Sequence, residues 1–129
     1  MVSASWKIKR SGTKAWRMKV VEIESKREVD DSTEQHYQEA LHAAAQACGS
    51  DHPEVAEAAG YLADLYMFLE RYGEAEALYR RALRIYKNTL GDEHMIYSMA
   101  LRNLAAVLEV RGKADEAKRL RYEARGIFG

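Results

Sequence analysis

The sequence contains very little proline and cysteine. One Pro in 129 residues, together with abundant Ala, favours helices over strands. The single cysteine, Cys48, excludes an internal disulfide framework and fits a reducing compartment. The formal net charge is zero, so bulk charge selects neither nucleic acid nor a membrane surface as a partner.

Long apolar runs are also missing. No stretch approaches the roughly 20 apolar residues that a helix needs to cross a bilayer. The N-terminus is basic, but no apolar signal core follows it, so the sequence shows no secretory signal. We therefore expect a cytoplasmic protein without a membrane partner, and the length suits one domain of ordinary size.

Charge of either sign is unevenly distributed along the chain. Residues 1–30 hold eight Lys or Arg against four acids, a balance of +4. Residues 31–79 hold ten acids and one base, a balance of −9, and residues 80–129 hold eleven bases and six acids, a balance of +5. Such segregation can orient a partner, or pair one molecule's acidic part with another's basic part. The alternative is a solvated helix surface with chance clustering.

The chain repeats itself with a period of 42 residues. The stretch Gly49-Ser-Asp-His52 matches Gly91-Asp-Glu-His94 at this offset. Further pairs at the same offset are Tyr37 and Tyr79, Ala40 and Ala82, Leu41 and Leu83, Leu62 and Leu104, Ala63 and Ala105, Glu74 and Glu116, Ala75 and Ala117, and Leu78 and Leu120. A constant offset in both halves of the unit indicates a repeat architecture.

Each repeat unit predicts two helices. Apolar residues at helical spacing predict helices over about 53–69, 74–90, 95–110 and 114–127, and a further second-type helix over 32–48. Pro53 suits a first helical position, and Gly91 suits a C-terminal stop. We expect small residues where helices approach closely and larger ones between them, as in stacked antiparallel helix pairs. The small residues are Ala63, Ala75, Ala82, Ala105 and Ala117, and the larger ones are Leu62, Tyr66, Leu78, Tyr79 and Leu83.

Two stretches carry a family resemblance, HPEVAEAAGYLADLYMFLERYGEAEALYRRALRIYKNTLGDEH and NLAAVLEVRGKADEAKRL. Their shared elements are Leu62-Ala63 with Tyr66, then Tyr72-Gly-Glu-Ala75, then Leu78-Tyr79-Arg-Arg-Ala82-Leu83. This arrangement resembles the tetratricopeptide repeat in its 42-residue kinesin-light-chain-type form, over about residues 31–128. The resemblance implies an all-α fold, with antiparallel helix pairs stacked as a short right-handed α-solenoid of about two and a half units.

Residues 1–30 are interpreted as a basic N-terminal cap, and residues 31–129 as the helical repeat domain. At the repeat offset, Val20 matches Leu62 and Ile23 matches Leu65, which favours a degenerate helix over about 15–28. Alternating apolar residues around Ser11-Gly12-Thr13 favour a short hairpin instead. Both interpretations stay open at this point.

The sequence gives no sign of an enzyme, and we expect no catalytic residue, no metal site and no cofactor. His52 and His94 occupy equivalent repeat positions, where a role at the helix start is expected rather than Zn ligation. Cys48 is interpreted as a small buried filler, and no Gly-rich phosphate loop is present.

Acids near helix starts, among them Glu74 and Glu76, are expected to be exposed, and the helix dipole favours acids at these positions. Trp interleaved with basic residues in 6–19 can bind nucleic acid, but a basic cap explains it better.

The family resemblance also implies a binding surface, because the first helices of such repeats line the concave side of the array. The positions carried over are Glu57, Gly60, Tyr61, Asp64, Met67, Met99, Arg102, Asn103, Ala106 and Glu109. A guanidinium at Arg102 can fork to a carboxylate of a peptide, and Asn103 can hold a peptide backbone. The paired Asn of the subfamily is kept only at Asn103.

Two functional hypotheses follow from different classes. The first is an adaptor that binds a peptide or protein segment in the concave groove. The second is a structural piece that associates with itself as a homo-oligomer, or a fragment of a larger repeat protein.

Overall fold

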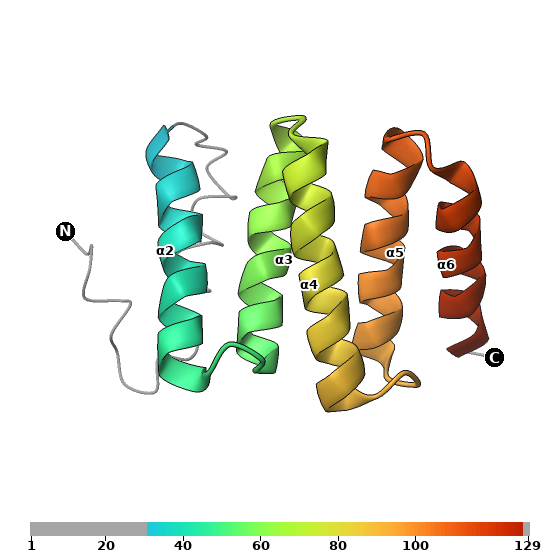
Figure 1. Ribbon diagram of the computed structural model, residues 1–129, viewed down its shortest axis with the longest axis horizontal. Helices are drawn as coiled ribbons and strands as arrows, with labels where there is room; N and C mark the ends of the chain where they lie inside the picture. Colours follow the sequence, from blue (N-terminus) through green and yellow to red (C-terminus); the bar gives the residue numbers. More distant parts are fainter. Residues whose placement is uncertain (1–30, 128–129) are drawn as a thin grey trace.

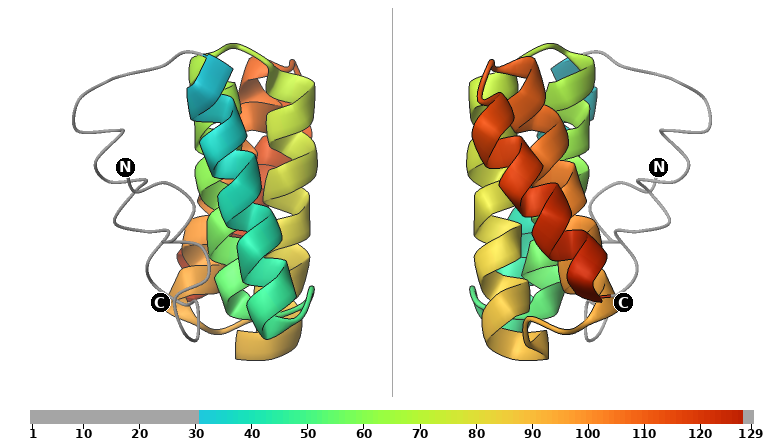
Figure 2. Two further views of the ribbon diagram at one scale, coloured as in Figure 1. Left: turned by 90° about the vertical axis from the view of Figure 1, so that its left-hand side faces the viewer. Right: turned by 90° about the vertical axis from the view of Figure 1, so that its right-hand side faces the viewer.

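Five α-helices make up the part of the chain that the computed structural model describes, residues 31–127. The helices are α2 (Asp31–Cys48), α3 (Pro53–Phe68), α4 (Tyr72–Leu90), α5 (Met95–Val110) and α6 (Ala114–Ile127). They stand side by side in chain order, and each packs mainly on its neighbours in the chain (Figure 1). Seen from either end, α3 and α4 lie in different layers (Figure 2). The described residues therefore form an all-α helical repeat stack, as the sequence predicted.

The repeat period of 42 is visible in where the helices start. The first helices α3 and α5 begin at Pro53 and Met95, and the second helices α4 and α6 begin at Tyr72 and Ala114. Each pair of starts is 42 residues apart. The predicted bounds agree closely, except that α4 begins at Tyr72 rather than 74, because the carbonyl of Arg71 already accepts a bond from the N–H of Ala75.

Two histidines begin the first helices of successive repeats. The Nδ1 atom of His52 accepts a hydrogen bond from the backbone N–H of Glu54 at 3.0 Å, and His94 accepts one from Ile96 at the same distance. Each side chain satisfies a backbone donor that the helix start leaves without an intrahelical partner. The predicted helix-start role of both histidines is confirmed, as is Pro53 at the first position of α3.

The turns between helices use left-handed backbone conformations. Within the described residues, Gly49, Gly91 and Gly112 have φ of 95°, 93° and 83°. Glu70 has φ of 63°, although it carries a side chain. Since Glu70 is the repeat equivalent of Gly112, the two turns share one backbone shape, and only the second has the residue that suits it.

The core lies along the contacts between consecutive helices. All five alanines that were predicted at close helix approaches are buried, with exposures of 3% or less. Leu62, Tyr66 and Tyr79 are buried beside them, whereas Leu78 and Leu83 are partly buried and pack against the core. Small and large side chains therefore alternate as the stacked-pair interpretation required.

The basic N-terminal cap predicted over residues 1–30, with its helix and hairpin alternatives, lies outside the described residues. None of the described helices is long and apolar enough to span a membrane.

Candidate functional site

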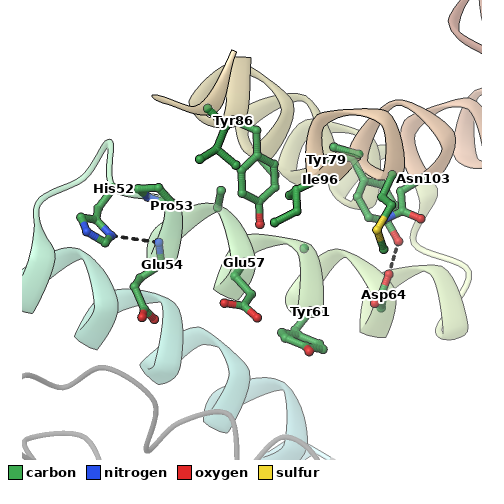
Figure 3. Close-up of a pocket in the computed structure, with 16 residues that line it drawn as sticks. His52, Pro53, Glu54, Glu57, Tyr61, Asp64, Tyr79, Tyr86, Ile96 and Asn103 are labelled. Carbon is green, nitrogen blue, oxygen red and sulfur yellow. Dashed lines mark hydrogen bonds between the residues drawn. The ribbon is translucent and has the colours of Figure 1, made fainter. Parts of the chain in front are cut away.

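A groove of about 570 Å³ lies between the first helices of two successive repeats, α3 and α5, with α4 behind it. Its wall residues are His52, Pro53, Glu54, Ala56, Glu57, Gly60, Tyr61 and Asp64 from α3 and its start, Tyr79, Ala82, Tyr86 and Leu90 from α4, and Ile96, Met99, Ala100 and Asn103 from α5. Figure 3 shows Tyr86 and Ile96 facing the helix that carries Glu57. The volume is of the size that small ligands or a short peptide segment occupy.

Six of the ten residues predicted for the binding surface line this groove. They are Glu57, Gly60, Tyr61, Asp64, Met99 and Asn103. The fold brings them together because α3 and α5 occupy equivalent places in neighbouring repeats, so that equivalent faces of the two helices border the same space. Gly60 leaves space beside the α3 wall, since a Cβ built there meets no atom within 4 Å.

The other four predicted residues lie outside the groove wall. Met67 is half-buried and packs against the core, and Ala106 is half-buried further along α5. Glu109 forms an ion pair with Arg121 of α6 at 2.8 Å, and the hydrogen bond from Arg121 lowers the pKa of the Glu109 carboxyl. Arg102 is exposed next to Asn103, but it does not line the groove.

The α3 wall of the groove is acidic and aromatic. The hydroxyl of Tyr79 on α4 donates a short hydrogen bond to Oδ1 of Asp64 (Figure 3). Burial raises the pKa of Tyr79 well above its usual range, and the charge of Asp64 raises it further. Tyr79 therefore stays a neutral donor that fixes the orientation of the Asp64 carboxylate.

The α5 wall is apolar at its edge. Ile96 and Met99 line the groove, yet their side chains are 40% and 53% exposed. Met95, at the start of the same helix, is 57% exposed. Exposed large apolar side chains that border a groove mark a surface suited to a partner.

Comparison with known proteins decides the family. The family model described as tetratricopeptide repeat matches residues 20–88 and again 54–128. The chain belongs to the tetratricopeptide repeat family. Repeats of this family generally mediate protein–protein interactions, and the family prediction made from the sequence is confirmed.

A solved structure supports the fold of these tetratricopeptide repeats. The crystal structure of BtubC (BKLC) from P. vanneervenii is similar with a TM-score of 0.82 and 22% sequence identity. The similarity covers 96% of this chain and 49% of that one, so this chain spans about half its length. The search of curated proteins found no match.

Sequence reasoning missed a cluster of charges that joins the two tetratricopeptide units. Glu76 was expected to be exposed at its helix start, but it is buried at 6% exposure. Its carboxylate accepts from Arg111 at 2.6 Å and from Lys113 at 3.3 Å, both from the α5–α6 turn, and from Arg80 at 2.9 Å. The expectation was wrong because the next unit folds over this face of α4 and supplies cations to it.

The same contact recurs one repeat earlier. Glu34 on α2 binds Arg71 in the α3–α4 turn at 2.8 Å, and both residues are 42 positions before Glu76 and Lys113. The hydroxyl of Tyr66 also donates to Glu34 at 2.8 Å. The matching offsets of the two acids and the two bases were a signal in the sequence that pairwise comparison of charges would have found.

The described residues contain no group of three or more His, Cys, Asp or Glu placed to hold a metal ion. Cys48 was expected to be a small buried filler, but it lies only half-buried at the end of α2. The position is open because the helix ends there and the chain turns away at Gly49.

Proposed function

We propose that the chain is an adaptor that binds a segment of a partner protein in the groove between α3 and α5. The observation that carries this proposal is the groove itself, since it joins equivalent faces of two successive repeats and has exposed apolar side chains at its edge. A protein segment offers both apolar side chains and backbone groups to such a surface.

The polar groups of the groove suit a peptide backbone. Asn103 is exposed on α5 and can donate and accept a hydrogen bond at once, as the backbone of an extended segment requires. Across the groove, the Asp64 carboxylate is held in place by Tyr79. Polar groups fixed on helices lower the ordering cost of binding.

The length of the groove sets the length of the bound segment. The α3 wall runs from Pro53 to Asp64, which corresponds to about 17 Å along a helix. An extended segment covers this distance with about five residues. We therefore expect short linear segments to bind, with the modest affinity that segments ordered on binding usually show.

Blocking the groove at Gly60 tests the proposal. Peptides that bind the wild-type chain are selected from a displayed library. Their affinities are then measured for Gly60→Phe, in which the new ring fills the space beside the α3 wall. We expect binding to fall at least tenfold, because the ring occupies the space of the peptide. The selection of no peptide, or equal binding by Gly60→Phe, would contradict groove binding.

Two controls separate blocking from damage to the fold. Gly60→Ala leaves most of the groove open and should raise helix stability by about 1 kcal/mol. Gly126→Phe places the same ring on α6, at another helical Gly with no atom within 4 Å of a built Cβ. Both variants should bind the selected peptides as the wild type does. Self-association, the alternative from the sequence, stays a prediction.

A further inference from the structure

The charged residues that line the groove in the described part of the chain all have one sign. Among the described residues that line it, Glu54, Glu57 and Asp64 are acids, and none is Lys or Arg. All three acids are on α3, but Glu54 is buried at 8% exposure, so Glu57 and Asp64 supply the accessible negative charge of this wall. Arg102, which the family resemblance suggested as an anchor for a carboxylate, lies outside this wall.

Aromatic rings accompany these acids. Tyr61 lies on α3 between Glu57 and Asp64, and Tyr79 and Tyr86 face the groove from α4 (Figure 3). The face of an aromatic ring attracts a Lys or Arg cation, most strongly where water is partly excluded. A guanidinium or ammonium that enters the groove therefore meets carboxylates and ring faces together.

The opposite wall selects for a different side chain. Ile96 and Met99 on α5 are apolar and partly exposed, and Met is a flexible surface that adapts to varied apolar partners. A segment that fits both walls carries cations toward α3 and apolar side chains toward α5.

We propose, on the basis of the proposed groove function, that the bound segment is basic and apolar, with Lys or Arg interleaved with large apolar residues. The argument is charge complementarity with the α3 wall, combined with the apolar edge of α5. A carboxylate-rich segment is disfavoured, because like charges that face each other in a groove weaken binding.

Two matched peptides test the charge assignment. The probes are fluorescein-labelled peptides of about ten residues that share the same Leu and Trp positions and differ only in Lys or Glu between them. On the full wild-type chain at low salt, we expect the Lys peptide to bind at least tenfold more tightly than the Glu peptide. The affinity for the Lys peptide should fall as salt is raised from about 0.05 M to about 0.3 M, since partly exposed charge pairs are screened.

Variants of the α3 acids locate the effect. Glu57→Gln combined with Asp64→Asn removes two charges and keeps an acceptor for the Tyr79 hydroxyl. This double variant should lower the affinity for the Lys peptide by about three- to tenfold. Asp115→Asn removes an exposed charge on α6 that does not line the groove, and it should leave binding unchanged.

The outcomes distinguish this inference from the function on which it rests. Equal or tighter binding of the Glu peptide, lost on Gly60→Phe, would overturn the charge assignment and keep groove binding. If neither the paired acid variant nor Gly60→Phe weakens binding of the Lys peptide, the peptide binds elsewhere on the chain. That result would overturn the inference. Failure of both peptides would also overturn it, and the display selection then decides separately whether the groove binds peptides.

Discussion

Glu70 is a single residue at which the backbone and the side chain have opposite requirements. Its φ of 63° lies in the left-handed region, where an L-residue with a Cβ is disfavoured by about 1 kcal/mol or more. The equivalent turn one repeat later has Gly112 with φ of 83°. The turn at Glu70 therefore keeps the shape of the Gly112 turn, although the side chain does not suit it.

We expect Glu70→Gly to raise the free energy of unfolding by about 0.5–1 kcal/mol, because relief at positive φ outweighs the added freedom of the unfolded chain. Urea denaturation followed by circular dichroism measures the change. The reciprocal control, Gly112→Ala, should lower stability by about 1 kcal/mol. A destabilised Glu70→Gly variant would show that the Glu70 side chain makes a compensating contact.

The family resemblance predicted part of the groove lining. Glu57, Gly60, Tyr61 and Asp64 followed from the family pattern because they lie at fixed positions of a first helix. Contributions from α4, such as Tyr86, did not follow, since a groove wall between helices depends on how two elements cross. Arg102 was predicted on the same surface but does not line the groove, because its position on α5 does not determine whether a long side chain lies inside the groove.

At the scale of elements, buried charge joins successive helix pairs. Burial raises the pKa of the Glu76 carboxyl, but hydrogen bonds from Arg111, Arg80 and Lys113 outweigh it and lower that pKa overall. Arg80 extends the cluster to Glu116 on α6 at 3.0 Å. One carboxylate on α4 therefore holds the turn and the second helix of the following unit.

We expect Glu76→Gln to lower the free energy of unfolding at neutral pH by about 1–3 kcal/mol, because the buried amide cannot balance three cations. Glu74→Gln is the matched control on the same helix. The Glu74 side chain is 51% exposed and pairs with Arg71, so its loss should change stability much less than the loss of Glu76. Equal effects of the two changes would contradict the structural role of burial at Glu76.

The pH dependence gives a second readout of the same change. A carboxyl whose pKa is lower in the folded state stabilises the fold above its unfolded pKa and loses that contribution as pH falls through the folded pKa. The stability difference between wild type and Glu76→Gln should therefore be full at neutral pH and shrink in acid, below the usual Glu value of 4.5. A difference that stays constant into acid would show that shape, rather than charge, sets the cost.

At the scale of the whole molecule, contacts follow the order of the chain. The helices α3, α4 and α5 pack on a neighbour at each side, whereas α6 packs mainly on α5 within the described residues. Only Ala117 and Ala124 of α6 are buried, out of the residues for which exposure is described. In such an array, stability is nearly a sum of units and their nearest-neighbour contacts.

We expect amide hydrogen exchange to reflect this arrangement. Backbone amides of α6 should exchange through local opening, while those of α3 and α4 should require a larger unfolding event. Exchange measured by mass spectrometry on the intact chain resolves the helices. Equal protection of α6 and α3 would indicate one cooperative unit and contradict the additive description.

Among the features of the molecule, the overall fold was the one best predicted from the sequence. The 42-residue offset, the helix starts at Pro53 and Met95 and the buried alanines are visible as residue types at fixed spacings, so they could be identified one by one. The contact between Glu76 and the following turn is non-local, and its partners carry no apolar periodicity. The exposure of Glu76 was therefore misjudged, although its helix was placed correctly.

The recurring contact from acid to turn also makes the repeat unit interchangeable. Glu34 contacts Arg71 at one junction, and Glu76 contacts Lys113 at the next. Each acid therefore contacts the basic turn of the unit that follows it. Tandem duplication of residues 53–94 would create a new junction in which Glu76 meets a second copy of Arg71, with the charges still matched. At α6 the equivalent position is Lys118, and a copy added there would set its basic turn against a cation. The charges at the junction therefore stay matched when a unit is duplicated within the array, whereas Lys118 would not match the basic turn of a unit packed on α6.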